Sequence, residues 1–285
     1  MLKIGHVSLS LSGRAPKNAS TSNQTLLLYL LLGAVTIQAN EKKCQQNTNF
    51  SKLPPSARVH APAAELLAFI KDAGHSGKID AFIKRTATRN RRWYKEMLSE
   101  FCNYFTFTAA NNHIAAFVSL YRITEYYAYA VPMLIACVGR DLYGTYDQLR
   151  SYFVGGDQQK GELGLFKKFL EKSPVFKEIL DYEYDVFITS NLAMRQSHYR
   201  LAIRLCPNPI SADETLHSFK VRFQDVLSFL IRARNRYMHF AIGQRSDNVH
   251  TDEILAPNEF FGCLNPIFVS FLAYILLETI GIDGQ

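Results

Sequence analysis

Apolar residues recur at intervals of three and four along most of this 285-residue chain, and this periodicity limits the fold more than any other feature. It is clearest over residues 92–104, 111–138, 211–238 and 264–280, which predict four helices. Shorter segments fit helices from residue 63 to a break at Gly74 and over 79–87, 149–153, 163–170, 174–180 and 185–205. Period-two alternation is confined to Ile4–Leu11. We therefore predict an all-α fold.

The chain divides into three parts by composition. Residues 1–62 predict a leader and a polar linker that contains Pro54, Pro55 and Pro62. Residues 63–105 form a basic helical extension, and residues 106–285 form the main helical bundle. Hydrophobic residues make up 48% of the chain and charged residues 20%, which excludes general disorder. The net charge of +7 permits a polyanionic partner.

An apolar run at residues 26–37, LLLYLLLGAVTI, leaves the localisation open. A secretory signal, a buried helix and an upstream extension from a misplaced start all fit this run. We expect a cytoplasmic protein, with secretion or membrane anchoring as the alternative if the run is a signal segment. A second run, Ile267–Leu277, is too short to span a membrane comfortably and predicts a core helix.

The five cysteines are widely spaced and odd in number, and no C-x-x-C occurs. This pattern favours buried free thiols over a disulfide framework or a zinc site. The histidines other than His239 match no metal-ligand spacing, and no P-loop or dinucleotide-binding fingerprint occurs. We therefore expect neither a metal nor a cofactor.

The most informative charged residue of the chain is Arg234, on the helix predicted over 211–238. Ser211 and Glu214 have the form of a capping box at its start. On a wheel of about 100° per residue, Arg234 falls about 20° from Phe223, inside the apolar stripe. A buried unpaired charge is costly, so we expect either an acidic partner such as Glu125 or an opening of the stripe into a polar cleft or subunit contact.

Asn235 and His239, on the same predicted helix, are four residues apart and share a face. On an ideal helix this face is about 100–140° from Arg234, so Arg234 and His239 converge only if the helix loosens or a second copy of the chain contributes. A histidine takes a proton from a ribose 2′-hydroxyl near neutral pH, and an arginine stabilises charge that develops on a phosphate. The chemistry that suits Arg234 and His239 is RNA cleavage by internal transesterification, without a metal.

Arg234-x4-His239, with Asn235 directly after the arginine, resembles the signature of HEPN domains, and residues 117–127 resemble the first long helix of many bacterial members. The resemblance covers residues 106–285. It implies a HEPN-like helical bundle that dimerises through the motif helices and forms a composite site. By resemblance, Arg234 would contact the scissile phosphate, His239 would act as general acid and base, and Asn235 would support them. Ala241 occupies a position where some members carry a modified tyrosine.

A basic run precedes and begins the helix at 92–104, and Trp93 and Tyr94 lie within it. Phosphates favour such a run, and aromatic rings stack on bases. The alternative is a solvated helix face with Trp93 in the core. The nucleic-acid-binding residues that we predict are Arg89, Arg91, Arg92, Lys95 and Arg236.

These observations predict a dimeric, metal-independent endoribonuclease with Arg234, His239 and Asn235 at its site. The resemblance implies RNA as substrate and a bacterial defence or toxin setting, with an antitoxin or defence protein as a further partner. The alternative is a non-catalytic HEPN-like scaffold that binds a protein or a nucleotide.

Overall fold

A computed structural model of the chain describes residues 2–4, 7–11, 22–39, 42–51, 83–84, 86, 88–138, 143–144, 146–147, 150, 162–238 and 253–283. The predicted helices at 63–74 and 149–153 and most of the one at 79–87 lie outside these residues. So do most of the predicted linker, His239 and Ala241.

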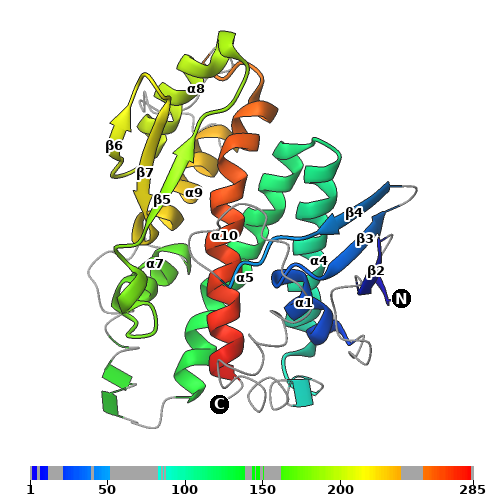
Figure 1. Ribbon diagram of the computed structural model, residues 1–285. Helices are drawn as coiled ribbons and strands as arrows, with labels where there is room; N and C mark the ends of the chain where they lie inside the picture. The colour runs from blue at the N-terminus through cyan, green and yellow to red at the C-terminus, as the bar shows by residue number, and fades with distance from the viewer. Residues whose placement is uncertain are drawn as a thin grey trace.

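Three long helices form the centre of the fold. α4 (Arg91–Ala109) and α5 (His113–Val138) are joined by a short turn and run antiparallel, and α10 (Pro257–Asp283) lies along α5 (Figure 1). Asn258 at the start of α10 fixes this arrangement, because its Oδ1 accepts a hydrogen bond from the backbone N–H of His113 at 2.6 Å. All three helices confirm predictions from the apolar periodicity.

Aromatic packing joins α5 to α10. The rings of Phe117 and Phe261 lie 4.4 Å apart, and the hydroxyl of Tyr127 donates to the Leu272 carbonyl at 3.0 Å. Among the described residues, only Pro257–Ile280 is long and apolar enough to cross a membrane, and 83% of its most apolar stretch is buried inside the fold. This burial is what a core helix shows, and it agrees with the prediction for residues 267–277.

A four-stranded antiparallel sheet packs against α4. Its strands are β1 (Leu2–Ile4), β2 (Val7–Leu11), β3 (Val35–Ala39) and β4 (Lys42–Gln46), in that spatial order, and α1 (Asn23–Leu31) connects β2 to β3. The apolar run at 26–37 is therefore a buried helix followed by a strand. Gly33 permits the change of direction between them, because its φ is +80° and a Cβ there would lie 2.7 Å from the Asn47 carbonyl oxygen.

A three-stranded antiparallel sheet lies on the other side of α10 (Figure 1). Its order is β5-β7-β6, from β5 (Glu183–Phe187), β6 (Ile210–Asp213) and β7 (Ser218–Arg222). α7 (Glu162–Lys172) and the short 3-10 helix η1 (Lys177–Ile179) precede it. α8 (Leu192–Leu205) connects β5 to β6, and α9 (Phe223–Met238) follows β7.

The prediction of an all-α fold is therefore wrong, because the described residues form a mostly helical α/β structure with two antiparallel sheets. The predicted helix at 185–205 begins instead as strand β5. The one at 211–238 begins as the hairpin of β6 and β7. Tyr184, Val186, Phe219 and Val221 alternate with exposed or half-buried neighbours, which is the period of a strand covered on one face.

The capping box predicted at Ser211 is also absent from the structure. Ser211 lies in β6 with a φ of +49°, and Glu214 pairs with Arg200 on α8. Asp213 organises the turn instead, because its Oδ1 accepts from the backbone N–H groups of Thr215 and Leu216. A side chain that bonds to the backbone two and three residues ahead stabilises a turn as readily as a helix start.

Candidate functional site

Arg234 lies near the end of α9, and its guanidinium stacks on the ring of Tyr121 from α5. The distance from Cζ to the ring centroid is 4.5 Å, and Nη1 donates to Asn235 Oδ1 at 3.0 Å. Among the described residues no carboxylate forms an ion pair with Arg234. The Arg234 charge, predicted to lie in an apolar stripe, is thus half-exposed and contacts an aromatic ring. The predicted partner Glu125 forms no ion pair with it.

Two opposite charges act on Tyr121. Burial raises the pKa of its hydroxyl above the ordinary value of 10.0, Arg234 lowers it, and Glu125 raises it. Tyr121 therefore stays neutral over the physiological range, and both charged groups lie near its ring. Asn235 is exposed beside Arg234. His239 follows α9 outside the described residues, so its pairing with Arg234 stays a prediction.

The cationic residues predicted from the basic run gather at the start of α4. Arg89, Arg91, Arg92 and Lys95 are all exposed there. The first turn of α4 contains no acidic residue, and Asn90 at its cap makes no side-chain capping bond. The positive end of the helix dipole adds to these four charges, which makes this end of α4 attractive to anions.

One expectation about this surface needs correction. Tyr94 is fully buried, so it cannot stack on a base, whereas Trp93 is only half-buried. Arg236 lies on α9, half-buried and about 200° around the helix from Arg234, and its role in RNA binding stays a prediction.

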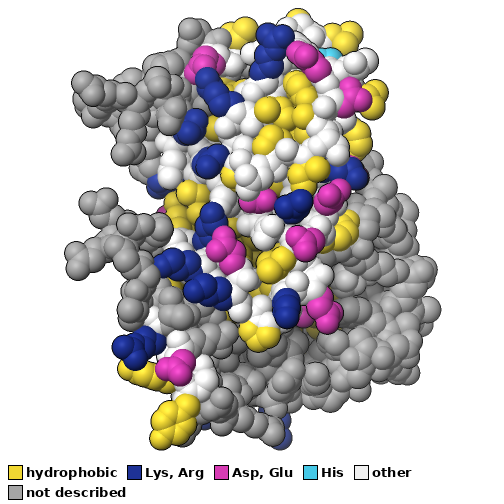
Figure 2. Space-filling model, turned by 90° about the vertical axis from the view of Figure 1, so that its left-hand side faces the viewer, with side chains coloured by type: hydrophobic (Ala, Val, Ile, Leu, Met, Phe, Trp, Pro, Cys, Tyr) yellow, Lys and Arg dark blue, Asp and Glu magenta, His cyan; other side chains and the backbone are white. Residues whose placement is uncertain are grey.

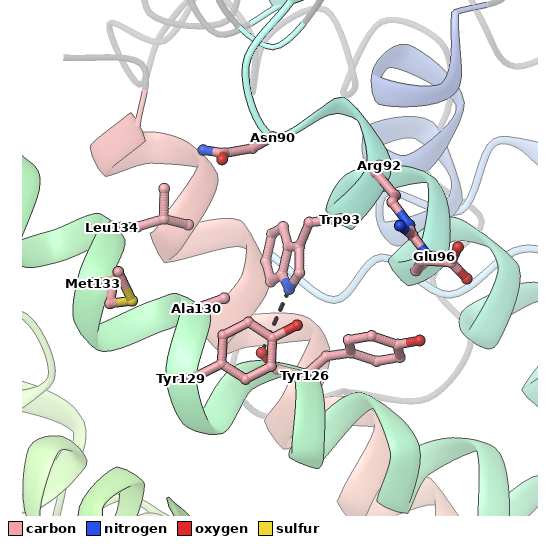
Figure 3. A pocket seen from close by; sticks show the side chains of 9 residues that line it. All are labelled: Asn90, Arg92, Trp93, Glu96, Tyr126, Tyr129, Ala130, Met133 and Leu134. Carbon is pink, nitrogen blue, oxygen red and sulfur yellow. Dashed lines mark hydrogen bonds between the residues drawn. The ribbon is translucent and has the colours of Figure 1, made fainter.

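A groove of about 600 Å³ lies between the start of α4 and the second half of α5. We call it the Trp93 groove; Figure 3 shows the indole of Trp93 standing over α5, with Tyr129 and Met133 in front and Asn90 above. Trp93 Nε1 points to the Tyr126 carbonyl at 3.4 Å, which fixes the plane of the ring. Tyr129 is 46% exposed and Met133 64% exposed, so apolar surface here faces water.

Two further hollows border the Trp93 groove and share residues with it. The basic hollow, of about 680 Å³, adds Arg91 and Lys95 on the α4 side. The Glu125 hollow, of about 390 Å³, adds Arg122 and Glu125 along α5. The three hollows thus adjoin one another from the start of α4 to Glu125. Glu125 also acts electrostatically on Tyr121, whose ring contacts Arg234.

Sequence reasoning missed the α5 part of this surface. The apolar positions of the helix predicted over 111–138 include Val118, Tyr121, Tyr126 and Tyr129, but in the structure Val118 and Tyr129 are exposed and Tyr126 is half-buried. The available signal was the spacing of Arg122, Glu125, Tyr126, Tyr129 and Met133, which lie on one helix face at intervals of three and four. Tyrosine is compatible with burial and with exposure, so its periodicity alone did not separate the two faces.

Arg122 pairs with Glu100 on α4 rather than with Glu125, which is three residues ahead of it on α5. Arg122 Nη2 lies 2.8 Å from Glu100 Oε1; the Glu100 side chain is 4% exposed and that of Arg122 54%. Burial raises the pKa of Glu100 above 4.5, and Arg122 and a hydrogen bond with Asn103 oppose the shift. This pair fixes α4 and α5 beneath the surface just described.

The face formed by the three-stranded sheet and α8 differs in charge. Figure 2 shows basic and acidic side chains interspersed over it. Several are paired: Arg200 with Glu214 at 3.2 Å, Lys220 with Glu183 at 3.1 Å, and Arg204 with Glu253 at 2.6 Å. These pairs neutralise part of the charge of the described residues on this face.

Within the described ranges, no group of three or more His, Cys, Asp or Glu side chains is placed to hold a metal ion. Comparison with protein-family models, with curated proteins and with solved structures finds no match for this chain. The resemblance to HEPN domains therefore stays a prediction that depends on the residues at 117–127 and 234–239 alone.

Proposed function

We propose that the protein is an endoribonuclease that cleaves RNA without a metal ion, with Arg234 and His239 as its catalytic residues. The observation that carries the proposal is the state of Arg234. Its guanidinium is half-exposed at the end of α9, oriented by Tyr121 and Asn235, and without a carboxylate partner among the described residues. An arginine held in this way is available to a phosphate, because the ring leaves its N–H donors largely uncommitted.

The proposed reaction is an internal transesterification. His239 takes the proton of a ribose 2′-hydroxyl, and the 2′-oxygen forms a bond to the adjacent phosphorus. The bond from phosphorus to the 5′-oxygen breaks, and that oxygen leaves with a proton from the histidine. Arg234 stabilises the negative charge that builds on the phosphoryl oxygens, and Asn235 orients the guanidinium. The products carry a 2′,3′-cyclic phosphate and a 5′-hydroxyl.

The test is cleavage of a labelled RNA by purified protein in EDTA. General acid–base catalysis and charge stabilisation each contribute about 10²-fold or more, so Arg234→Ala and His239→Ala are each expected to lose at least that much activity. Arg232→Ala is the matched control, because it removes an exposed cation from the same helix. A substrate with a 2′-deoxyribose at the cut must resist cleavage.

No cleavage by the wild-type protein, or equal cleavage by all variants, contradicts the proposal. A site composed from two copies of the chain, as the HEPN resemblance implies, adds a further expectation. The specific activity of the wild-type protein then falls when dilution dissociates the dimer, while the activity of a monomeric enzyme does not change.

The second candidate is a non-catalytic scaffold, and one observation favours it. The contact of Arg234 with Tyr121 joins α9 to α5, which is a structural task in itself. A scaffold predicts that Arg234→Ala lowers the melting temperature, that Arg234→Lys partly restores it, and that neither the wild-type protein nor any variant cleaves RNA.

A further inference from the structure

We infer that the Trp93 groove binds one unpaired nucleobase of a single-stranded RNA, with the neighbouring phosphates on Arg91, Arg92 and Lys95. The inference rests on the proposed function and names its substrate class. It begins from the shape of the groove, whose volume of about 600 Å³ lies inside the range of small-molecule sites, about 300–1,000 Å³.

The aromatic side chains of the groove suit a flat base. Trp93 is held by its bond to the Tyr126 carbonyl and by an edge contact with Tyr94, with ring centroids 4.8 Å apart. Its plane is therefore set before any ligand binds. Tyr129 and Met133 expose apolar surface opposite it (Figure 3), and a base that covers this surface removes it from water.

The charges beside the groove favour a nucleotide over an uncharged ligand. Asn90, Arg92 and Glu96 line both the Trp93 groove and the basic hollow, so a base in the first places its phosphate at the second. Arg91 and Lys95 lie there, at the positive end of α4. The Glu96 carboxylate is available to accept a hydrogen bond from an exocyclic amino group of the base.

The position of the groove between two helices selects single strands. A base must leave its stack to enter, and unpaired bases in loops and ends do so at a low cost, whereas paired bases do not. We therefore expect double-stranded RNA of the same sequence to bind weakly.

The surface also sets a distance between the bound base and the cut. Tyr129 lines the groove and Tyr121 carries Arg234, and these positions are eight residues apart on α5, about 12 Å at 1.5 Å per residue. A fully stacked strand has a phosphate about every 3.4 Å, and an extended strand covers more distance per nucleotide. At most about four nucleotides therefore separate the bound base from the cut.

Binding is measured with a labelled, unstructured RNA in the His239→Ala background, which prevents cleavage. Tyr129→Ala removes half-exposed aromatic surface with little risk to folding, and it is expected to weaken binding roughly 5- to 100-fold. Phe187→Ala is its control, an exposed aromatic on β5. Lys95→Gln is expected to weaken binding and to reduce its salt dependence, with Lys172→Gln, exposed on α7, as control.

A hairpin duplex, single-stranded DNA of the same sequence and a free mononucleotide complete the set of ligands. Preference for the unstructured RNA, together with losses in Tyr129→Ala and Lys95→Gln alone, supports the inference. Equal binding of the duplex, tighter binding of the mononucleotide, or unchanged affinity in Tyr129→Ala overturns it.

Scanning a cleavable RNA with single abasic positions tests the distance. One abasic position, at a fixed offset of at most about four nucleotides from the cut, is expected to slow cleavage most, and a flat profile contradicts the inference. Its failure is distinguishable from that of the proposed function. Cleavage that requires Arg234 but not Tyr129 leaves only the nuclease, whereas Tyr129-dependent binding without cleavage leaves only the groove.

Discussion

Replacement of Arg122 by methionine tests whether the ion pair under the α4–α5 surface stabilises the fold. The Glu100 carboxylate is 4% exposed and its partner is 54% exposed. Loss of one partner of a fully buried pair costs about 3–5 kcal/mol, whereas an exposed pair contributes about 0–1 kcal/mol. Because only the glutamate is buried, we expect Arg122→Met to lower the free energy of unfolding by about 1–3 kcal/mol at pH 7.

The loss depends on pH in a direction that the structure fixes. Burial raises the pKa of folded Glu100 above 4.5, and Arg122 lowers it, so Arg122→Met raises it further. Just above pH 4.5 the folded variant then binds more protons than the unfolded chain, and stability falls as the pH rises through this window. The variant is therefore closest to the wild-type protein near pH 4.5 and furthest from it at neutral pH.

Urea denaturation at pH 4.5 and 7.5 measures the effect, with the fluorescence of Trp93, the single tryptophan, as the probe. Glu100→Gln should restore most of the stability of Arg122→Met, because it removes the unpaired charge. Lys220→Met breaks the exposed pair with Glu183 and serves as control, with an expected loss of about 1 kcal/mol or less. Equal losses of Arg122→Met at both pH values, or no rescue by Glu100→Gln, would refute the reasoning.

The remaining predictions concern the amino-terminal part of the chain and the Glu125 hollow. Leu30 is fully buried, so Leu30→Ala should lower the free energy of unfolding by about 2–5 kcal/mol in a thermal melt, and a chain that begins at residue 40 should fail to fold. If the chain that begins at residue 40 folds stably, this result would instead support a removable leader before that residue. Gly33→Ala places a Cβ against the Asn47 carbonyl at a positive φ and should cost about 1–3 kcal/mol by denaturant titration; an unchanged midpoint would contradict this. Glu125→Gln removes a negative charge that acts on Tyr121, the residue under Arg234, and should strengthen RNA binding about two- to fivefold at low salt. Binding that weakens would show that the carboxylate holds the ligand.

The sequence predicted the long helices well, because each repeats its apolar positions over several turns. α4, α5 and α10 all include the segments predicted from periodicity. α4 also continues across the predicted boundary at residues 105 and 106. A pattern that extends over many residues leaves little ambiguity between the periods of a helix and a strand.

The strands of the three-stranded sheet were missed because each is short and borders a helix, whereas the alternation over Ile4–Leu11 did mark β2. β5 and β7 contain five residues each, and their buried positions also fit a helical wheel when joined to the next segment. Phe219 illustrates this, because it fits the apolar stripe of the helix predicted over 211–238. In the structure it is instead a buried residue of strand β7. The run at 26–37 was predicted in part. A buried helix was one of its alternatives, but a fully apolar segment has no period to distinguish α1 from β3.

The candidate site was predicted in part. Arg234 and the cations at the start of α4 could be chosen from charge alone, because a charge in an apolar stripe or a dense basic run is visible in the sequence. The part that α5 contributes through Glu125 and Tyr129 depends on which face of α5 is left uncovered by neighbouring helices. That choice is made by tertiary packing, which one sequence does not reveal.

α5 therefore determines how the two halves of the proposed site are related. Its buried side is fixed to α10 by the Tyr127 hydroxyl and by Phe117. Positions on its exposed side therefore keep fixed distances from one another. Arg234 contacts this helix near its start and Trp93 contacts it farther along. A base in the groove and a phosphate at Arg234 must then keep a constant separation. Surface substitutions at either end should change binding or cleavage separately, and only damage to the packing of α5 should change both.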